Sequence, residues 1–91
     1  EILQHQSKND DVWSVKSLNH YYLGEYNNAI FCIQKAIELC PESHYYLNIR
    51  ASIYLDSGKI EEAMVDLKKA ISLENNITYH GNLGLAYYHL H

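Results

Sequence analysis

Apolar residues recur along this chain at intervals of three and four, the spacing that places side chains on one side of an α-helix. Between residues 27 and 39, for example, the recurring positions are Ala29, Ile33, Ala36 and Ile37. No segment alternates apolar and polar residues over a useful length, so no sheet is expected. The pattern predicts five helices, over residues 11–23, 27–39, 45–55, 60–73 and from 78 to the end of the chain.

Turn and capping residues separate the predicted helices. Gly24 follows the first helix, where glycine can adopt the left-handed conformation that ends a helix. Pro41 prevents the second helix from continuing. Ser43 and Asn76 are the predicted N-caps of the third and fifth helices, and the Asn-Asp-Asp segment 9–11 is the predicted cap of the first.

Two of the predicted helices repeat each other. Residues 24–39 recur as residues 58–73 at a constant offset of 34, with six identical residues at matching places. A period of this size predicts helical hairpins that stack, because one hairpin alone leaves an apolar face open. The resulting division is a linker or the tail of a preceding helix (1–9), a first repeat (10–43), a second repeat (44–76), and a third-repeat or capping helix (77–91).

Composition narrows the class of protein. The 91 residues are 47% hydrophobic, which predicts one small folded domain. A net charge of −4 disfavours nucleic acids and anionic membranes and makes neutral or basic partners a better fit. No apolar run approaches the roughly 18 residues of a membrane span, so we expect a cytoplasmic protein. Cys32 and Cys40 lie eight residues apart on one predicted helix, too far to bridge, and are expected to be buried thiols.

Candidate chemistry is sparse. The six histidines lie without metal-ligand spacing, and no nucleophile stands beside a base in a recognisable motif. We therefore expect no catalytic activity, no metal and no cofactor. Glu61, Glu62 and Asp66 form an acidic helix face, which we interpret as solvated surface, with contact to a basic partner as the alternative.

The repeat resembles that of the tetratricopeptide family, whose pattern runs Trp-x2-Leu-Gly-x2-Tyr, then Ala-x3-Phe, then Pro. Ala29-x3-Ile33 and Ala63-x3-Leu67 match the second element, and residues 83–87 read Leu-Gly-x2-Tyr. The resemblance implies an all-α fold of antiparallel helix-turn-helix repeats, stacked as a short right-handed α-solenoid of five helices. The places that match the repeat are Trp13, Gly24, Ala29, Ala36, Pro41, Ala51, Tyr54, Gly58, Ala63, Ala70, Gly84 and Tyr87.

The first helix matches this pattern least well, because Lys16 stands where leucine is usual and His20 where tyrosine is usual. Two registers are possible. Either Lys16 extends along the edge of the core, or the helix is rotated so that Leu18 and Tyr22 take the apolar places.

The family resemblance also implies a function. It implies a non-catalytic protein-interaction module whose first helices line a concave groove for a peptide or helix of a partner, within a larger scaffold protein. Tyrosine and asparagine are prominent there and suit an interface, although the tyrosines could instead fill the core between repeats. The implied groove residues are Asp11, Ser14, Leu18, Tyr21, Tyr45, Asn48, Ser52, Leu55, Thr78, Leu85 and Tyr88, with Gly81 beside them.

Some members of the family bind the C-terminal carboxylates of chaperones through Lys, Arg and Asn side chains in the groove. The corresponding places in this chain are Ser14, Leu18, Ile49, Thr78 and Asn82, none of them basic. From these residues we expect binding of a chaperone C-terminal carboxylate to be disfavoured.

A structural role is the alternative to peptide binding. The fifth predicted helix lacks a partner helix of its own, so Leu83, Ala86, Tyr87 and Leu90 should leave part of an apolar face uncovered. The chain could then form a homo-oligomer through its C-terminal helix, or stack within a longer array.

Overall fold

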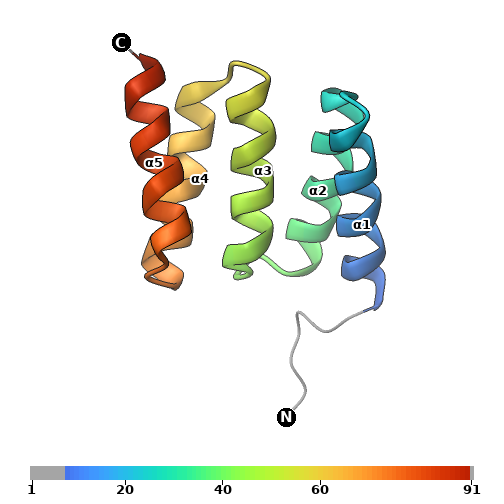
Figure 1. Ribbon diagram of the computed structural model, residues 1–91. Helices are drawn as coiled ribbons and strands as arrows, with labels where there is room; N and C mark the ends of the chain where they lie inside the picture. Colours follow the sequence, from blue (N-terminus) through green and yellow to red (C-terminus); the bar gives the residue numbers. More distant parts are fainter. Residues whose placement is uncertain (1–7, 91) are drawn as a thin grey trace.

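The computed structural model describes residues 8–90 and is entirely α-helical over that range. Figure 1 shows the helices in chain order, with short turns between them. All five predicted helices are present, each beginning and ending within three residues of its predicted bounds. Their bounds are Lys8–Tyr22 (α1), Tyr26–Leu39 (α2), His44–Asp56 (α3), Ile60–Leu73 (α4) and Ile77–Leu90 (α5).

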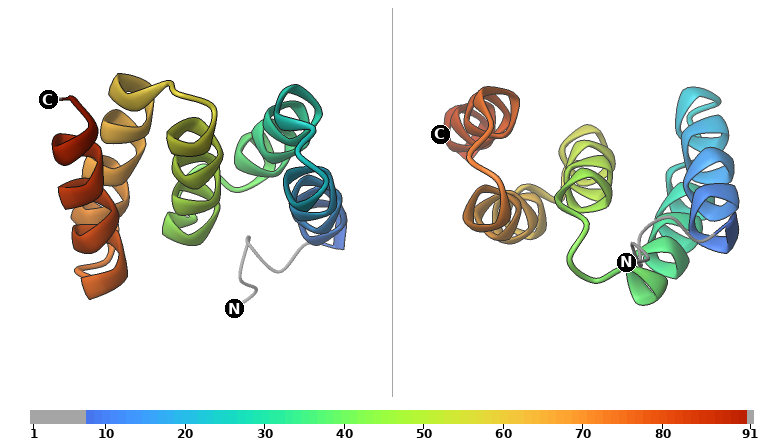
Figure 2. Two further views of the ribbon diagram at one scale, coloured as in Figure 1. Left: turned by 45° about the horizontal axis from the view of Figure 1, so that its top comes forward. Right: turned by 90° about the horizontal axis from the view of Figure 1, so that it is seen from below.

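The helices form two layers. α1, α3 and α5 run in the same direction in one layer, and α2 and α4 run the opposite way in the other (Figures 1 and 2). α1 pairs with α2 and α3 with α4 as hairpins, while α5 packs against α4. The predicted antiparallel hairpins are confirmed, and α1, α3 and α5 share one face of the molecule.

The turns within the two hairpins are alike. Gly24 and Gly58 have φ angles of 79° and 86°, a left-handed conformation that glycine adopts without a steric penalty. Before α3, the Ser43 side chain accepts a hydrogen bond from the Tyr46 backbone N–H at 3.2 Å. Before α5, Asn76 accepts one from Thr78 N–H at 2.7 Å. These predicted glycine turns and caps are confirmed.

The start of the first helix was predicted wrongly. α1 already includes Lys8, so residues 8 and 9 belong to a helix and segment 9–11 is not its cap; residues 1–7 lie outside the described part. Asp10 is fully buried and accepts a hydrogen bond from the Tyr46 hydroxyl at 2.5 Å. Its partner comes from the next repeat, 36 residues further along, where a local reading of cap residues cannot find it.

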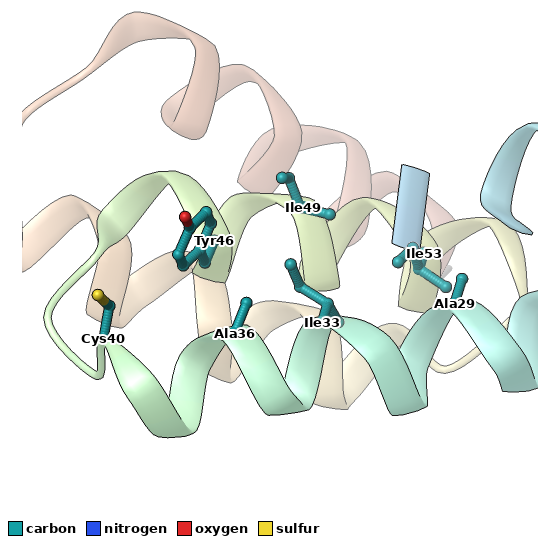
Figure 3. Packing of buried hydrophobic residues seen from close by; sticks show 7 residues of the cluster. All are labelled: Ala29, Ile33, Ala36, Cys40, Tyr46, Ile49 and Ile53. Atoms are coloured by element: carbon teal, nitrogen blue, oxygen red, sulfur yellow. The ribbon is translucent and has the colours of Figure 1, made fainter. Parts of the chain in front are cut away.

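The core between the repeats joins α2 to α3. Figure 3 shows Ala29, Ile33 and Ala36 of α2, with Cys40 just after this helix, facing Tyr46, Ile49 and Ile53 of α3, and all seven are buried. A second cluster joins α3, α4 and α5, with members Leu47, Ala51, Ala63, Leu67, Ala70 and Tyr79. Every predicted repeat alanine is fully buried, because small side chains stand where helix backbones approach most closely.

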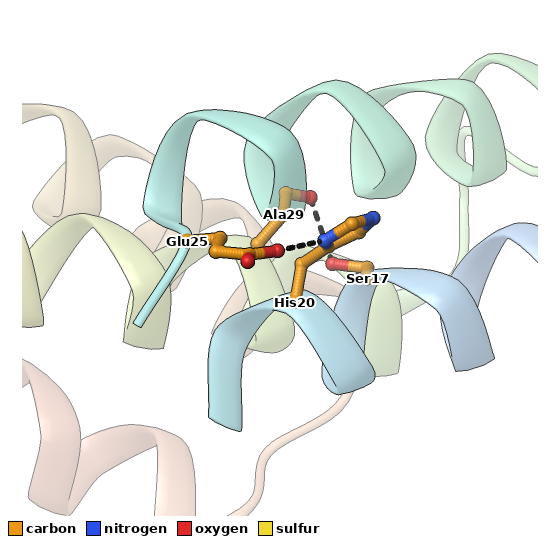
Figure 4. A network of polar contacts seen from close by, with 4 residues as sticks. All are labelled: Ser17, His20, Glu25 and Ala29. Atoms are coloured by element: carbon orange, nitrogen blue, oxygen red, sulfur yellow. Dashed lines mark hydrogen bonds and ion pairs between the residues drawn. The ribbon is translucent and has the colours of Figure 1, made fainter. Parts of the chain in front are cut away.

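The register of α1 is set by Ser17. Its side chain is fully buried and its hydroxyl donates to the Ala29 carbonyl of α2 at 2.8 Å (Figure 4). Lys16 is exposed, with its Nζ 5.1 Å from the centre of the Trp13 ring. The first of the two registers is therefore correct, since Lys16 lies at the edge of the core. Leu18 is partly buried as well, but Tyr22 is exposed.

A polar contact near Ser17 spans the turn of the first hairpin. His20 Nδ1 of α1 lies 2.6 Å from Glu25 Oε1, just before α2 (Figure 4). His20 therefore stands at the repeat position where the family usually has tyrosine. Its ring forms a polar contact there instead of packing as a tyrosine ring would.

Asp66 was predicted to be solvated, and that prediction is wrong. Its side chain is buried between α3 and α4, where both carboxylate oxygens accept from Arg50, Oδ2 from Nε at 2.8 Å and Oδ1 from Nη2 at 2.7 Å. These hydrogen bonds raise the pKa of the Arg50 guanidinium against the opposing effect of burial. One feature of the sequence pointed to the burial of Asp66. The matching residue 34 places earlier is Cys32, which is also buried.

The thiols of Cys32 and Cys40 are both buried and form no disulfide, as the sequence predicts. Burial raises the pKa of the Cys40 thiol to about 11, with the nearby Asp10 carboxylate adding to the effect. Burial and a hydrogen bond to Asp10 also raise the pKa of the Tyr46 phenol.

Raising the pH should therefore destabilise the fold. An unfolded chain releases the Cys40 proton near its ordinary pKa of 9.0, whereas the folded chain holds it to about 11, so the unfolded state binds fewer protons in that window. The contribution is complete below pH 9 and falls as the pH rises toward 11. Urea unfolding followed by circular dichroism at increasing pH measures this, and a Cys40→Ala variant should lose less stability across the window. A midpoint that does not change with pH would contradict the assignment.

Candidate protein-binding face

The predicted groove residues come from three helices that lie side by side and run the same way. α1, α3 and α5 form one layer, so their outward side chains share a surface, here called the α1–α3–α5 face (Figure 2). Its candidate members, taken from the sequence prediction, are Asp11, Ser14, Leu18, Tyr21, Tyr45, Asn48, Ser52, Leu55, Thr78, Gly81, Leu85 and Tyr88.

These residues differ in how much surface they offer. Tyr45 and Tyr88 are 53% and 76% exposed, and Asp11, Thr78 and Leu85 are exposed as well. The partly buried members are Leu18, Tyr21, Asn48, Ser52 and Leu55. Ser14 is buried, and its hydroxyl donates to the Asp11 carbonyl at 2.8 Å, so it offers least to a ligand.

An amide pair joins α3 to α5 on this face. The Asn82 amide nitrogen of α5 donates to the Asn48 carbonyl oxygen of α3 at 2.9 Å. Each asparagine keeps hydrogen-bonding capacity beyond this bond, since an amide side chain has two donors and an oxygen with two lone pairs. Asn82 was predicted only as a place of the carboxylate clamp. The offset between the second and third repeats is 33, as from Ala51 to Gly84, so repeat spacing matches Asn48 to Gly81 and gave no signal for this pair.

Five of the nine tyrosines fall into two groups. Tyr21 donates to Asp56 at 2.5 Å, Tyr46 to Asp10, and the Tyr79 hydroxyl lies 2.7 Å from His44 Nδ1, so these three tie adjacent repeats together. Burial, and then Asp56, raise the pKa of the Tyr21 phenol. The alternative reading of tyrosine as inter-repeat structure therefore describes these residues, whereas Tyr45 and Tyr88 face solvent.

The polarity of the α1–α3–α5 face changes along the helix axes. Tyr45 and Asn48 lie in the N-terminal half of α3, while Leu55 lies near its C-terminal end. α1 and α5 place Leu18 and Leu85 in their C-terminal halves as well. Because the three helices run parallel, a polar band and an apolar band cross all of them. No member of the face is a lysine or arginine.

Neither a group of metal-ligating side chains nor a membrane-spanning helix is found among the described residues. Within residues 8–90, no three His, Cys, Asp or Glu side chains lie close enough together to hold a metal ion. The same part of the chain contains no helix with the length and hydropathy needed to cross a bilayer.

Comparison with known proteins agrees with the fold. Residues 10–43 match a family model described as tetratricopeptide repeat, and residues 51–90 match one described as TPR repeat. The chain is 42% identical over 50 residues (55% of the chain) to the STIP1 homolog of Dictyostelium discoideum. It is 32% identical over 73 residues (78% of the chain) to human DnaJ homolog subfamily C member 3. It spans only 9% and 14% of the lengths of these two relatives.

A solved structure is similar over most of the chain. The first TPR of Spaghetti (RPAP3), bound to the HSP90 peptide SRMEEVD, superposes with a TM-score of 0.87 at 26% identity, over 92% of this chain and 69% of that one. This finding goes against the expectation that chaperone C-terminal carboxylates are disfavoured ligands. The expectation is corrected, because a domain of this fold binds such a peptide and the fold therefore accommodates this class of ligand.

The 34-residue period, the two layers of antiparallel hairpins and the two family matches lead to one assignment. The chain belongs to the tetratricopeptide repeat family, with five helices that make about two and a half repeats, and it is a protein-interaction module.

Proposed function

We propose that this domain is a non-catalytic module that holds a peptide segment of a partner protein across the α1–α3–α5 face. One observation carries the proposal: α3 and α5 present the exposed side chains of Tyr45, Leu85 and Tyr88 near the Asn48–Asn82 amide pair. The partly buried Leu18 and Leu55 add apolar surface from α1 and α3. A surface of this kind offers apolar contact area together with hydrogen bonds to a backbone.

The two bands suggest how a peptide lies. A segment running across the helices would set its backbone against the amides of Asn48 and Asn82, whose free donors and acceptors match a peptide unit. Its apolar side chains would meet Leu18, Leu55 and Leu85 in the neighbouring band. Tyr45 and Tyr88 would flank the chain on α3 and α5.

The first ligand to test is the HSP90 peptide SRMEEVD, because the similar TPR structure binds it. In this chain the carboxylates of that peptide would meet amide and hydroxyl groups instead of lysine and arginine side chains. Binding should therefore depend weakly on salt, since few ion pairs would be screened.

Changing Tyr45 and Asn48 together to alanine should weaken peptide binding about tenfold or more, because the change removes an exposed aromatic contact and the Asn48 amide. Neither Tyr45 nor Asn48 belongs to a core cluster, so the fold should persist. Fluorescence anisotropy with labelled SRMEEVD measures the affinity, and circular dichroism checks the fold. Val65→Ala is the matched control, since Val65 is 68% exposed on α4, outside the face.

Two outcomes would count against the proposal separately. Unchanged affinity in the Tyr45 and Asn48 double variant would reject the face as the binding site. Failure of SRMEEVD to bind the wild-type chain would reject that ligand alone. A peptide selected on the wild-type chain from a display library would then take its place in the same comparison.

A further inference from the structure

Three tyrosine rings gather where the first hairpin turns. Tyr21 and Tyr22 are the last residues of α1, and Tyr26 is the first residue of α2. The ring centroid of Tyr21 lies 5.5 Å from that of Tyr22 and 6.2 Å from that of Tyr26. Tyr22 is 78% exposed, so most of its ring is open to solvent. These three residues are here called the tyrosine cluster.

A carboxylate from the second repeat lies against this cluster. Asp56, the last residue of α3, is exposed, and its Oδ2 accepts a hydrogen bond from the Tyr21 hydroxyl at 2.5 Å. Its Oδ1 takes part in no hydrogen bond or ion pair with the described residues. The carboxylate is therefore held by one oxygen and keeps the other for a further donor.

The position of Asp56 within its helix disfavours its charge. α1 and α3 run in the same direction, so their C-terminal ends lie at one edge of the molecule, the upper edge in Figure 1. The last carbonyl groups of a helix carry a partial negative charge, which favours cations and opposes anions. Lys59 follows in sequence, yet none of the ion pairs among residues 8–90 involves Asp56. A carboxylate in this position is suited to bind a cation from outside the chain.

We propose that the tyrosine cluster and Asp56 form a binding site for an arginine side chain of the partner peptide. The inference rests on the proposed function, because the site adjoins Tyr21 and Leu55 at the C-terminal end of the α1–α3–α5 face. A guanidinium group can donate to Oδ1 of Asp56 while its plane lies against the exposed ring of Tyr22.

The charge of the surroundings favours the same ligand. The chain has a net charge of −4, and the α1–α3–α5 face contains no lysine or arginine that would repel a cation. A negative surface raises the local concentration of cationic groups. Arginine fits this site better than lysine, because a planar guanidinium stacks on an aromatic ring and still donates hydrogen bonds at its edge.

A titration of the isotope-labelled chain with N-acetyl-arginine amide, followed by heteronuclear NMR, tests the site. The backbone amide signals of Tyr21, Tyr22 and Asp56 should shift toward saturation, about threefold further than with N-acetyl-citrulline amide at the same concentration. Citrulline has nearly the same shape as arginine and no charge, and sodium chloride balances the ionic strength of the two titrations. Equal shifts with the two compounds would overturn the proposal.

Two variants locate the site. Asp56→Asn should weaken arginine amide binding about fivefold, because asparagine still accepts from the Tyr21 hydroxyl but carries no charge. Tyr22→Ala should weaken it about threefold, since it removes an exposed ring outside the core clusters. The control is Glu74→Gln, which removes one exposed negative charge at the opposite end of α4 and should leave binding unchanged. Wild-type affinity in both site variants, or an equal loss in Glu74→Gln, would overturn the proposal.

A selection experiment connects the site to peptide binding. Peptides selected from a display library on the wild-type chain should contain arginine about threefold more often than peptides selected on Asp56→Asn. Equal arginine content would overturn the role of the site in holding a partner. The Tyr45 and Asn48 double variant should bind arginine amide as the wild type does while losing the peptide. The binding face and the arginine site can therefore fail separately.

Discussion

Replacing Asp66 with alanine should lower the free energy of unfolding by about 3 kcal/mol, the cost typical of removing one partner from a buried ion pair. The Asp66 side chain is 5% exposed and receives two hydrogen bonds from Arg50, whose own side chain is 21% exposed. Without the carboxylate, the guanidinium stays largely buried between α3 and α4 with no anion to compensate it. Urea denaturation followed by circular dichroism measures the loss.

A double variant separates the cost of leaving one buried charge unpaired from the net contribution of the Arg50–Asp66 ion pair to stability. Changing Arg50 to Met and Asp66 to Leu together removes both charges and keeps most of the volume, so much of the stability should return. Asp66→Asn keeps the shape of the side chain and should lose less than Asp66→Ala. If Asp66→Ala were as stable as the wild type, Arg50 would have another partner or reach water, and the pair would not matter to the fold.

Replacing Ile33 with alanine should cost about 3 to 4 kcal/mol, within the range measured for large-to-small changes in protein cores. Ile33 is fully buried in the cluster that joins α2 to α3 (Figure 3). Its truncation would leave a cavity at the junction between the two hairpins, where the surrounding helices can close in only partly. The loss again appears as a lower urea midpoint.

The Ile33 variant should also unfold less cooperatively. In stacked repeats the contacts between neighbours couple their unfolding, so a weakened junction lets one hairpin open before the other. A broader transition, with a smaller dependence on urea, would report this. Gln34→Ala on the same helix is the control, because Gln34 is exposed and should change neither the midpoint nor the slope. A sharp transition in Ile33→Ala would contradict coupling through this cluster.

The binding face was predictable only in part. Repeat spacing identified the three helices that share the face, and residues such as Tyr45, Leu85 and Tyr88 are exposed there. Ser14 was predicted with them but is buried, with its hydroxyl bonded to the Asp11 carbonyl. Asn82 was predicted only as a place of the carboxylate clamp, although it bonds to Asn48. Side chains beside a junction between repeats point toward either solvent or the neighbour, and helical spacing alone does not distinguish the two.

The expectation about chaperone peptides shows a second limit of predicting function from single positions. The exclusion came from five places where lysine, arginine or asparagine is expected in some family members. A similar domain bound to SRMEEVD removes that exclusion for the fold. Charge at a few positions sets how an acidic ligand is held, whereas amides and hydroxyls can also contribute hydrogen bonds to it.

The sequence by itself determined the helices, their turns and the repeat. Apolar spacing, left-handed glycines and capping side chains act within a few residues, and the 34-residue period follows from comparing the chain with itself. Only the tertiary structure decided the pairing of Arg50 with Asp66, of Tyr46 with Asp10, and of Asn48 with Asn82. These partners lie 16 to 36 residues apart and meet because helices stack, so their burial and hydrogen bonds depend on distances that no local pattern contains.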